Sequence, residues 1–189
     1  YGTTEDPFIP AELVFGARGN FFARSFDVEL KTTQEILEEA ARHKGTSVCE
    51  ILTNCVIFNH GIHSGITDRE VRADRTIHLR HGEKMLFGKD NEKGLVRDGF
   101  LLKAVEVGKD GYTIDDVLVH DAHCESNFLH QQLAMMDGQS LPLAIGVIRD
   151  YDAPTYNESL TEQVAEVRAK KGFDSLRGMI LAGETWEVK

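Results

Sequence analysis

Cys55 stands just beyond an apolar run in the segment SVCEILTNCVIFN, residues 47–59. A thiolate in this place can ligate a metal or an iron–sulfur cluster, or act as a nucleophile. A free cysteine can equally be a small buried hydrophobe, and its position alone leaves both interpretations open. No other cysteine has a ligand spacing, because Cys49 lies on the apolar run and Cys124 is far away. If Cys55 binds iron, the remaining ligands therefore come from outside this sequence.

Histidines offer a second kind of site. Three pairs share an i, i+3 spacing: His60 and His63, His78 and His81, and His120 and His123. On a helix, residues at this spacing share one face, and a hydrolytic zinc site needs three protein ligands with one position left open. Residues 120–124, HDAHC, offer imidazole, carboxylate and thiolate groups within five residues. However, residues 115–120 read as a strand, and neither HExxH nor CxxC occurs. We therefore favour ordinary surface or core histidines and keep a zinc-binding domain as the alternative.

A local excess of cations interrupts an acidic chain, whose formal net charge is -10. The cations between positions 69 and 89 are Arg69, Arg72, Arg75, Arg80, Lys84 and Lys89. They could receive a phosphate-bearing ligand or an acidic partner protein. Carboxylates are interleaved with them, namely Asp68, Glu70, Asp74 and Glu83. A solvated loop face is therefore the favoured interpretation.

The elements that position Cys55 are predicted from periodicity and from signals at their ends. The expected elements are a helix over residues 10–16, a strand over 20–26, a helix over 31–45 and a strand over 47–52. The second helix has an apolar stripe and a capping box of Thr32 with Glu35. Strand, helix and strand within about 30 residues form a βαβ unit. Its two strands are expected to run parallel in a sheet that is covered by helices.

Beyond residue 60 the pattern changes. Residues 61–99 are polar, charged and dotted with glycine, so we expect little regular structure, few buried apolar contacts and fast hydrogen exchange there. Later elements are strands over residues 99–108, 115–120 and 141–150, and helices over 125–136, 157–172 and 173–183. Asn157 is the expected N-cap of the longest of these helices, and Gly172 its end. The predicted domains are an α/β domain, 1–60, and a loop region with a carboxyl-terminal α/β extension, 61–189.

Composition excludes several classes of protein. No apolar run is long enough to span a membrane, and the start YGTTEDPFIP has neither the basic nor the apolar region of a signal peptide. Three cysteines are too few for a disulfide framework, and an odd number cannot all pair within the chain. This cysteine content favours the reducing cytoplasm. The net negative charge argues against nucleic acid, whose binding needs clustered cations. We therefore expect neither nucleic acid nor a membrane as a partner.

The segment SVCEILTNCVIFN resembles a signature of the β subunits of 2-oxoacid:ferredoxin oxidoreductases, in which an apolar strand, a polar step, Cys and an apolar-Phe-Asn ending follow one another. Other stretches resemble the same family in the same order: residues 1–24, 82–96, 142–158 and 182–189. Within the family, the 2-oxoglutarate enzymes resemble the chain best. The resemblance implies an α/β fold, part of a thiamine-diphosphate-binding fold with a parallel sheet and flanking helices, plus a carboxyl-terminal extension.

Two features of that family do not occur in the sequence. These are the segment with cysteines for a four-iron four-sulfur cluster, and the Gly-Asp-Gly-Asp…Asn motif that holds Mg²⁺ and the cofactor diphosphate. The chain therefore resembles the carboxyl-terminal portion of a β subunit, and we expect no cofactor to be bound by this chain alone. The resemblance implies that Cys55 corresponds to the fourth cysteine ligand of the cluster. The step Thr53-Asn54 departs from the commoner Ser-Pro and leaves the cysteine in register.

The resemblance implies an enzyme subunit that decarboxylates 2-oxoglutarate, or a related 2-oxoacid, to an acyl-CoA and reduces ferredoxin. The full complex would contain thiamine diphosphate, Mg²⁺ and a four-iron four-sulfur cluster. Its partners would be the α subunit, ferredoxin, the 2-oxoacid substrate and coenzyme A. No residue is assigned as a catalytic acid or base, and Asn59, Asp90 and Lys93 are cofactor-contact candidates in family-like loops. The alternative is a non-catalytic assembly module that is inactive in isolation.

Overall fold

The structure is a computed structural model, and it describes residues 4–5, 8–171, 175–186 and 188. The chain forms two compact units, Tyr1–Asp152 and Ala153–Lys189. The predicted division at residue 60 does not coincide with this boundary, because strands from both sides of residue 60 pair in one sheet. None of the helices in the described part of the chain is long and apolar enough to cross a membrane.

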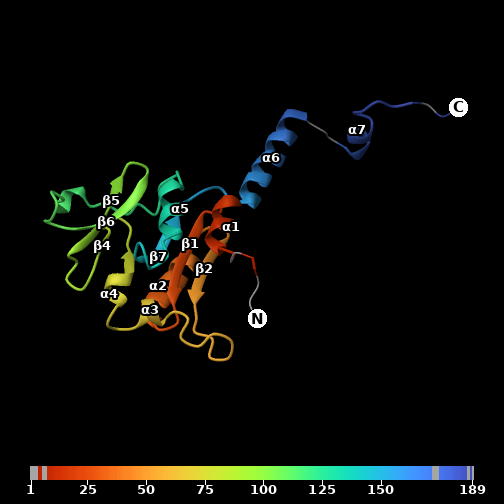
Figure 1. The fold of residues 1–189 in the computed structure, drawn as a ribbon. Coiled ribbons are helices and arrows are strands. Elements are labelled where there is room, and N and C mark those ends of the chain that lie inside the picture. Colours follow the sequence, from red (N-terminus) through yellow and green to blue (C-terminus); the bar gives the residue numbers. More distant parts are fainter. Residues whose placement is uncertain (1–3, 6–7, 172–174, 187, 189) are drawn as a thin grey trace. The chain divides into compact units, whose positions relative to one another are not determined.

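Four strands form the main sheet of the first unit, in the order β2-β1-β7-β3 (Figure 1). Their bounds are Phe21–Phe26 (β1), Ser47–Leu52 (β2), Thr76–Leu79 (β3) and Leu143–Asp150 (β7). β1 and β2 pair in parallel, which confirms the predicted βαβ unit. β7 runs antiparallel to β1 and parallel to β3. The sheet is therefore mixed, and the predicted parallel pairing holds for β1 with β2 and for β3 with β7 but not for β1 with β7.

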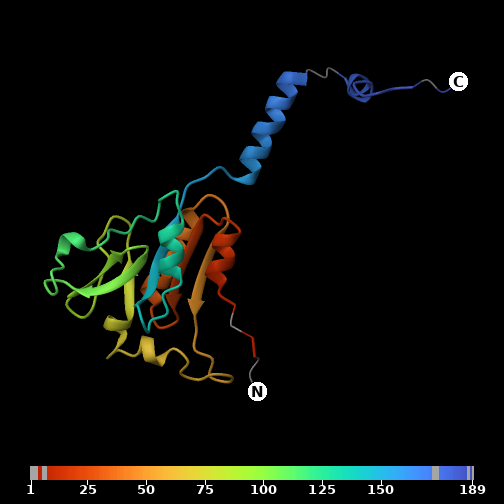
Figure 2. The same ribbon diagram turned by 45° about the horizontal axis from the view of Figure 1, so that its top comes forward.

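Helices cover both faces of this sheet, so every residue of β1 is buried. The helices are α1 (Pro10–Gly16), α2 (Leu30–Arg42) and α5 (Phe128–Ala134), which is shorter than predicted. Phe21 of β1 packs with Ile36 of α2 on one face. Phe22 points to the other face, where α1 and α5 lie together (Figure 2), and its ring centroid is 5.6 Å from that of Phe15. This alternation along β1 follows from the two-residue period of a strand.

The start of α2 differs from the predicted one. The helix begins at Leu30, so Thr32 lies inside its first turn. The Thr32 hydroxyl donates to Glu29 Oε2 at 3.0 Å and does not form the predicted capping box with Glu35. An earlier start places the hydroxyl one turn too far along the helix to cap the free backbone N–H groups.

Residues 61–99 fold into short elements, so the predicted lack of regular structure is wrong. Besides β3, these elements are α3 (Ser64–Thr67), α4 (Arg72–Arg75), β4 (Leu86–Phe87) and β5 (Lys93–Asp98). Ile77, Met85 and Leu95 lie in the core and are at most 1% exposed. Elements this short cannot be predicted from hydrophobic periodicity, because that periodicity is visible only over longer stretches of sequence. Slow rather than fast hydrogen exchange is therefore expected in β3 and β5.

A second, antiparallel sheet has the order β4-β5-β6. Its last strand, β6 (Leu101–Glu106), confirms the strand predicted over residues 99–108. The strand predicted over residues 115–120 is wrong, because a short 3-10 helix, Ile114–Asp116, occupies its start. A capping box between Thr113 and Asp116 stabilises that helix and diverts the chain from an extended course. Within the predicted range 115–120, Val119 forms an isolated β-bridge with Lys84.

The described residues of the second unit form two helices, α6 (Tyr156–Lys171) and α7 (Leu176–Ile180), as predicted from the sequence. Asn157 is not the N-cap of α6, because the helix already includes it. Thr155 caps the helix instead: its backbone N–H donates to Glu158 Oε2 at 2.8 Å, and its Oγ1 accepts from the Glu158 N–H at 3.3 Å. Gly172, the predicted end, lies outside the described residues.

Candidate functional site

The loop after β2 carries Cys55 and is tied to the end of β1. The two strands are parallel, so they end at the same edge of the sheet. Asp27, directly after β1, accepts a hydrogen bond from the backbone N–H of Asn54, which lies 2.9 Å from Oδ2. The Asn54 side-chain oxygen in turn accepts from the Gly61 N–H at 2.8 Å. These bonds fix both ends of the loop and hold Cys55 at the carboxyl end of a strand.

The turn from Cys55 to Asn59 aims backbone N–H groups at the thiol. The Asn59 N–H donates to the Cys55 carbonyl at 3.0 Å and closes the turn. The Phe58 N–H donates to the half-buried Sγ at 3.5 Å. Hydrogen bonds from the backbone of Phe58, then of Ile57, and to a lesser degree of Asn59, lower the pKa of the Cys55 thiol. The turn therefore favours the thiolate, which is the form that binds metals.

Three apolar side chains project into solvent beside this thiol. Val56, Ile57 and Phe58 are 68%, 81% and 89% exposed. They occupy the loop that extends below β2 in the orange part of the ribbon (Figure 1). A contiguous group of exposed apolar side chains is typical of a surface that another protein covers.

The two cysteines near the end of β2 are expected to differ in reactivity. Burial raises the pKa of the Cys49 thiol, whereas backbone N–H groups lower that of Cys55. Because the thiolate is the attacking species, iodoacetamide should modify Cys55 about tenfold faster than Cys49 at neutral pH. Mass spectrometry of peptides from timed, quenched samples measures both rates together. Equal rates would show that the backbone N–H groups do not activate Cys55.

The other predicted site residues do not gather around Cys55. Asn59 closes the Cys55 turn, whereas Lys93 begins β5 and Asp90 lies in the turn between β4 and β5. The second sheet, which contains both strands, lies apart from the Cys55 loop in both views (Figures 1 and 2). Lys93 Nζ pairs with Asp74 Oδ1 at 2.6 Å, and Asp90 is exposed. No hydrogen bond or ion pair in the described part of the chain joins Asn59 to either residue. Their role as cofactor contacts stays a prediction.

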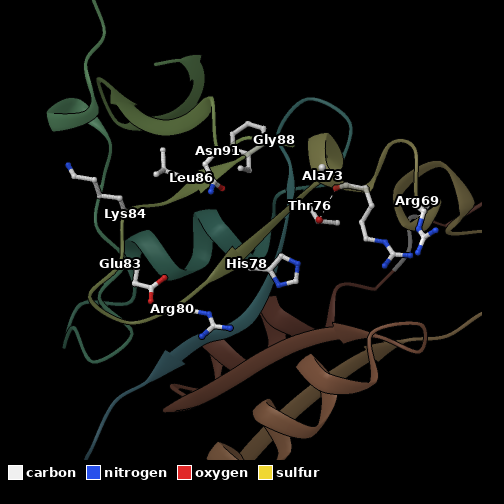
Figure 3. Close-up of a pocket in the computed structure, with 12 residues that line it drawn as sticks. Arg69, Ala73, Thr76, His78, Arg80, Glu83, Lys84, Leu86, Gly88 and Asn91 are labelled. Atoms are coloured by element: carbon white, nitrogen blue, oxygen red, sulfur yellow. Dashed lines mark hydrogen bonds between the residues drawn. The ribbon is translucent and has the colours of Figure 1, made fainter. Parts of the chain in front are cut away.

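The basic stretch, for which the sequence favours a solvated face, lines a cavity of about 500 Å³. His78 and Arg80 approach the cavity from β3 and the residue after it, and Arg69 approaches from the segment between α3 and α4 (Figure 3). Arg75 is turned elsewhere, because its guanidinium donates to the Gln139 carbonyl at 2.9 Å. Sequence spacing could not reveal this cavity, because its cations come from separate elements.

The histidine pairs do not form a zinc site. The Nε2–H of buried His120 donates to the Val147 carbonyl at 2.9 Å. The ring of exposed His123 instead donates to the Asp150 carbonyl and packs on His81, with 4.2 Å between ring centroids. Among the residues that the structure describes, no three His, Cys, Asp or Glu side chains could hold a metal ion. The zinc alternative is wrong, because this segment is not helical and its paired side chains diverge.

Burial of His120 is expected to make the fold less stable in acid. Desolvation lowers the pKa of His120 from 6.5 to about 4. Protonation would place a charge on the buried Nδ1, which has no hydrogen-bond partner among the described residues. The unfolded chain binds this proton near its ordinary pKa, so the contribution is complete above about pH 6.5 and is lost as the pH falls toward about 4. We expect about 2 kcal/mol less free energy of unfolding at pH 5 than at pH 7.

Urea unfolding at both pH values, with His120→Gln beside the unaltered protein, measures this contribution. The glutamine amide can still donate to Val147 but does not titrate, so the variant should lose less stability in acid. The exposed His123→Gln is the matched control and should behave like the unaltered protein. An equal acid loss in His120→Gln and the unaltered protein would exclude His120 as the cause.

Comparison with known proteins points to one group of enzymes, although no protein-family model matches the chain. The 2-oxoglutarate oxidoreductase subunit KorB of Mycobacterium tuberculosis is 32% identical over 190 residues, which cover 99% of this chain and 50% of that subunit. The chain thus spans about half the length of the curated relative that it matches.

A solved structure shows the same likeness at the level of the fold. It is a 2-oxoglutarate:ferredoxin oxidoreductase from Magnetococcus marinus with 2-oxoglutarate, coenzyme A and succinyl-CoA bound. The TM-score is 0.51 at 17% identity, over 96% of this chain and 46% of that chain. These findings confirm the resemblance predicted from the sequence: over nearly its whole length, the chain is a relative of the 2-oxoglutarate oxidoreductase subunit KorB.

Proposed function

We propose that the chain forms part of the β subunit of a 2-oxoacid:ferredoxin oxidoreductase. The reaction converts 2-oxoglutarate, or a related 2-oxoacid, and coenzyme A into an acyl-CoA and CO₂. The oxidation releases two electrons, which reduce two ferredoxins one electron at a time. The relationship to KorB supports the family, and the Cys55 turn is the single observation in the structure that carries the proposal.

The surroundings of Cys55 support its proposed role as a ligand of a four-iron four-sulfur cluster. Such clusters are held by Cys thiolates, and hydrogen bonds to sulfur adjust their potential. The Phe58 N–H supplies one such bond, and the lowered pKa of Cys55 favours the thiolate. When bound, the cluster supplies single-electron transfer to ferredoxin. Cys49 lies on β2 with its thiol 4.0 Å from the Ile36 carbonyl, and in this proposal the further ligands come from elsewhere in the complex.

In this proposal the main sheet is the remaining part of a thiamine-diphosphate-binding fold. Thiamine diphosphate and Mg²⁺ are held elsewhere in the complex, because the chain has no Gly-Asp-Gly-Asp motif. The contribution of this chain is to position a ligand: Asp27 and Asn54 fasten the Cys55 turn to the sheet, and Asn59 closes it. The partners are the α subunit, ferredoxin, the 2-oxoacid and coenzyme A.

Purification of the complete complex that contains this chain tests the proposal. We expect ferredoxin reduction that requires both 2-oxoglutarate and coenzyme A, with two ferredoxins reduced for each CO₂ released. Pyruvate in place of 2-oxoglutarate identifies the preferred 2-oxoacid. A complex that retains iron and thiamine diphosphate but turns over no 2-oxoacid would contradict the proposal. It would support the non-catalytic assembly role, for which exposed Val56, Ile57 and Phe58 offer an interface.

A further inference from the structure

The cavity beside β3 gathers positive charge that the protein itself leaves largely unneutralised. Four cations and one carboxylate line it: Arg69, Arg72, Arg80, Lys84 and Glu83. Arg69 makes no hydrogen bond or ion pair with any residue that the structure describes. Arg80 is 60% exposed, and its Nη2 lies 3.8 Å from Glu35 Oε2, a weak, solvent-screened pair. Both guanidinium groups are therefore free to bind an anion.

Arg72 is held in place before any ligand arrives. Its Nε donates to the Thr67 carbonyl at 2.8 Å, and its Nη2 donates to the same oxygen. Its Nη1 lies 3.7 Å from Glu29 Oε1, so this guanidinium is partly neutralised but fixed in orientation. Lys84 contributes less, because its ammonium donates to the Ile114 carbonyl at 2.6 Å. A guanidinium fixed in this way loses little freedom when it binds a phosphate or carboxylate.

The opposite wall of the cavity is different in character. Leu86, Gly88 and Asn91, from β4 and the turn after it, face His78 and Arg80 across the open space (Figure 3). This wall offers apolar surface from Leu86 and an amide from Asn91. A volume of about 500 Å³ is in the range of cavities that bind small organic ligands. The cavity therefore suits a ligand that is anionic at one side and apolar at the other.

We propose that this cavity binds a phosphate-bearing ligand of nucleotide size, with the phosphates on Arg69, Arg72 and Arg80. A guanidinium group can donate two parallel N–H groups to the oxygens of one phosphate. It therefore binds phosphate more specifically than an ammonium group, which acts as a single point charge. Coenzyme A and a free nucleotide share this chemistry. An acidic protein surface fits less well, because the cations surround a cavity and do not form a flat face. The proposal does not depend on the oxidoreductase function, since the binding follows from the residues of the cavity alone.

Isothermal titration calorimetry of the full chain with pyrophosphate, ADP and coenzyme A tests this site. We expect all three probes to bind at low salt, and each affinity to fall as NaCl is added. Arg69→Gln and Arg80→Gln should each weaken binding by about tenfold or more, because each removes a charge-assisted hydrogen bond. Arg97→Gln on β5 is the matched control and should bind like the unaltered chain, because Arg97 is exposed and outside the cavity.

The relative affinities identify the source of the phosphate. Tighter binding of coenzyme A than of ADP supports a coenzyme A site, whereas equal binding supports a free nucleotide. Circular dichroism of each variant separates loss of binding from loss of fold. The site is refuted if none of the probes binds to the chain or to the complete complex, or if neither arginine substitution changes the affinity. Since no turnover is measured, this failure is distinguishable from failure of the oxidoreductase proposal.

Discussion

In the proposed oxidoreductase complex, Cys55→Ser is expected to remove most of the iron of one cluster and to lower ferredoxin reduction at least about tenfold. The substitution replaces a soft thiolate with a hydroxyl, which binds iron poorly. It also discards the effect of the Phe58 and Ile57 backbone N–H groups, which favour a thiolate at this position. In the proposed complex, thiamine diphosphate held outside this chain would supply the decarboxylation chemistry, so slow CO₂ release with an artificial acceptor should survive. Iron per subunit, visible absorption and ferredoxin reduction are measured on the same preparation.

Cys49→Ser is the matched control for this experiment. Cys49 lies on β2, and burial raises the pKa of its thiol, so it has no tendency to serve as a ligand. Its replacement should leave the iron content unchanged and reduce stability by about 1–3 kcal/mol through a poorly satisfied hydroxyl. Full iron in Cys55→Ser would end the ligand hypothesis. Cys55 would then be a thiol whose only demonstrated property is its place in a tight turn.

Gly146→Val is expected to lower the free energy of unfolding by about 2–5 kcal/mol. Gly146 lies in β7 between β1 and β3, and its φ is +97°. A Cβ at this position would lie 2.6 Å from the Leu79 carbonyl oxygen of β3. The positive φ costs an L-residue about 1–2 kcal/mol, and displacing packed backbone costs about 1–3 kcal/mol more. Urea unfolding followed by circular dichroism measures the change.

Gly16→Ala is the control for this substitution. Gly16 ends α1, and apart from its chain neighbours and the backbone of its own helix, no described heavy atom lies within 4 Å of the Cβ that alanine would add. We expect its effect to stay below about 1 kcal/mol in either direction. If Gly146→Val does not fold, Gly146→Ala adds a single carbon at the same contact and should still be clearly destabilised. A variant at Gly146 that is as stable as the unaltered protein would contradict the close approach of β3 and β7.

The Cys55 loop could be predicted because its information is local. An amphipathic helix, an apolar strand and a polar step follow one another, and each signal acts over a few residues. The same holds for α6, although Thr155 rather than the predicted Asn157 caps it. The lowered pKa of the Cys55 thiol could not be predicted, because it depends on the backbone of Phe58 and Ile57 rather than on their side chains.

The remainder of the main sheet could not be predicted, because its pairings join distant segments. β3 is four residues long and polar around its ends, and its partner β7 lies far along the chain. The antiparallel pairing of β1 with β7 is likewise absent from local pattern. The basic cavity depends on the same long-range arrangement, since it needs β3 and β4 side by side before Arg69 and Arg80 share one space.

The strand order also sets when the protein can fold. β1 and β2 can pair early through α2, but the other side of β1 waits for β7, Leu143–Asp150. A nascent chain that ends before β7 therefore presents the unpaired edge of β1, whose sequence FFARSF contains three phenylalanines. Such pairings over long sequence separation form slowly, and open apolar edges invite pairing with other chains. Synthesis that stalls in the second sheet is thus expected to yield aggregates, whereas chains that reach Asp150 can close the main sheet.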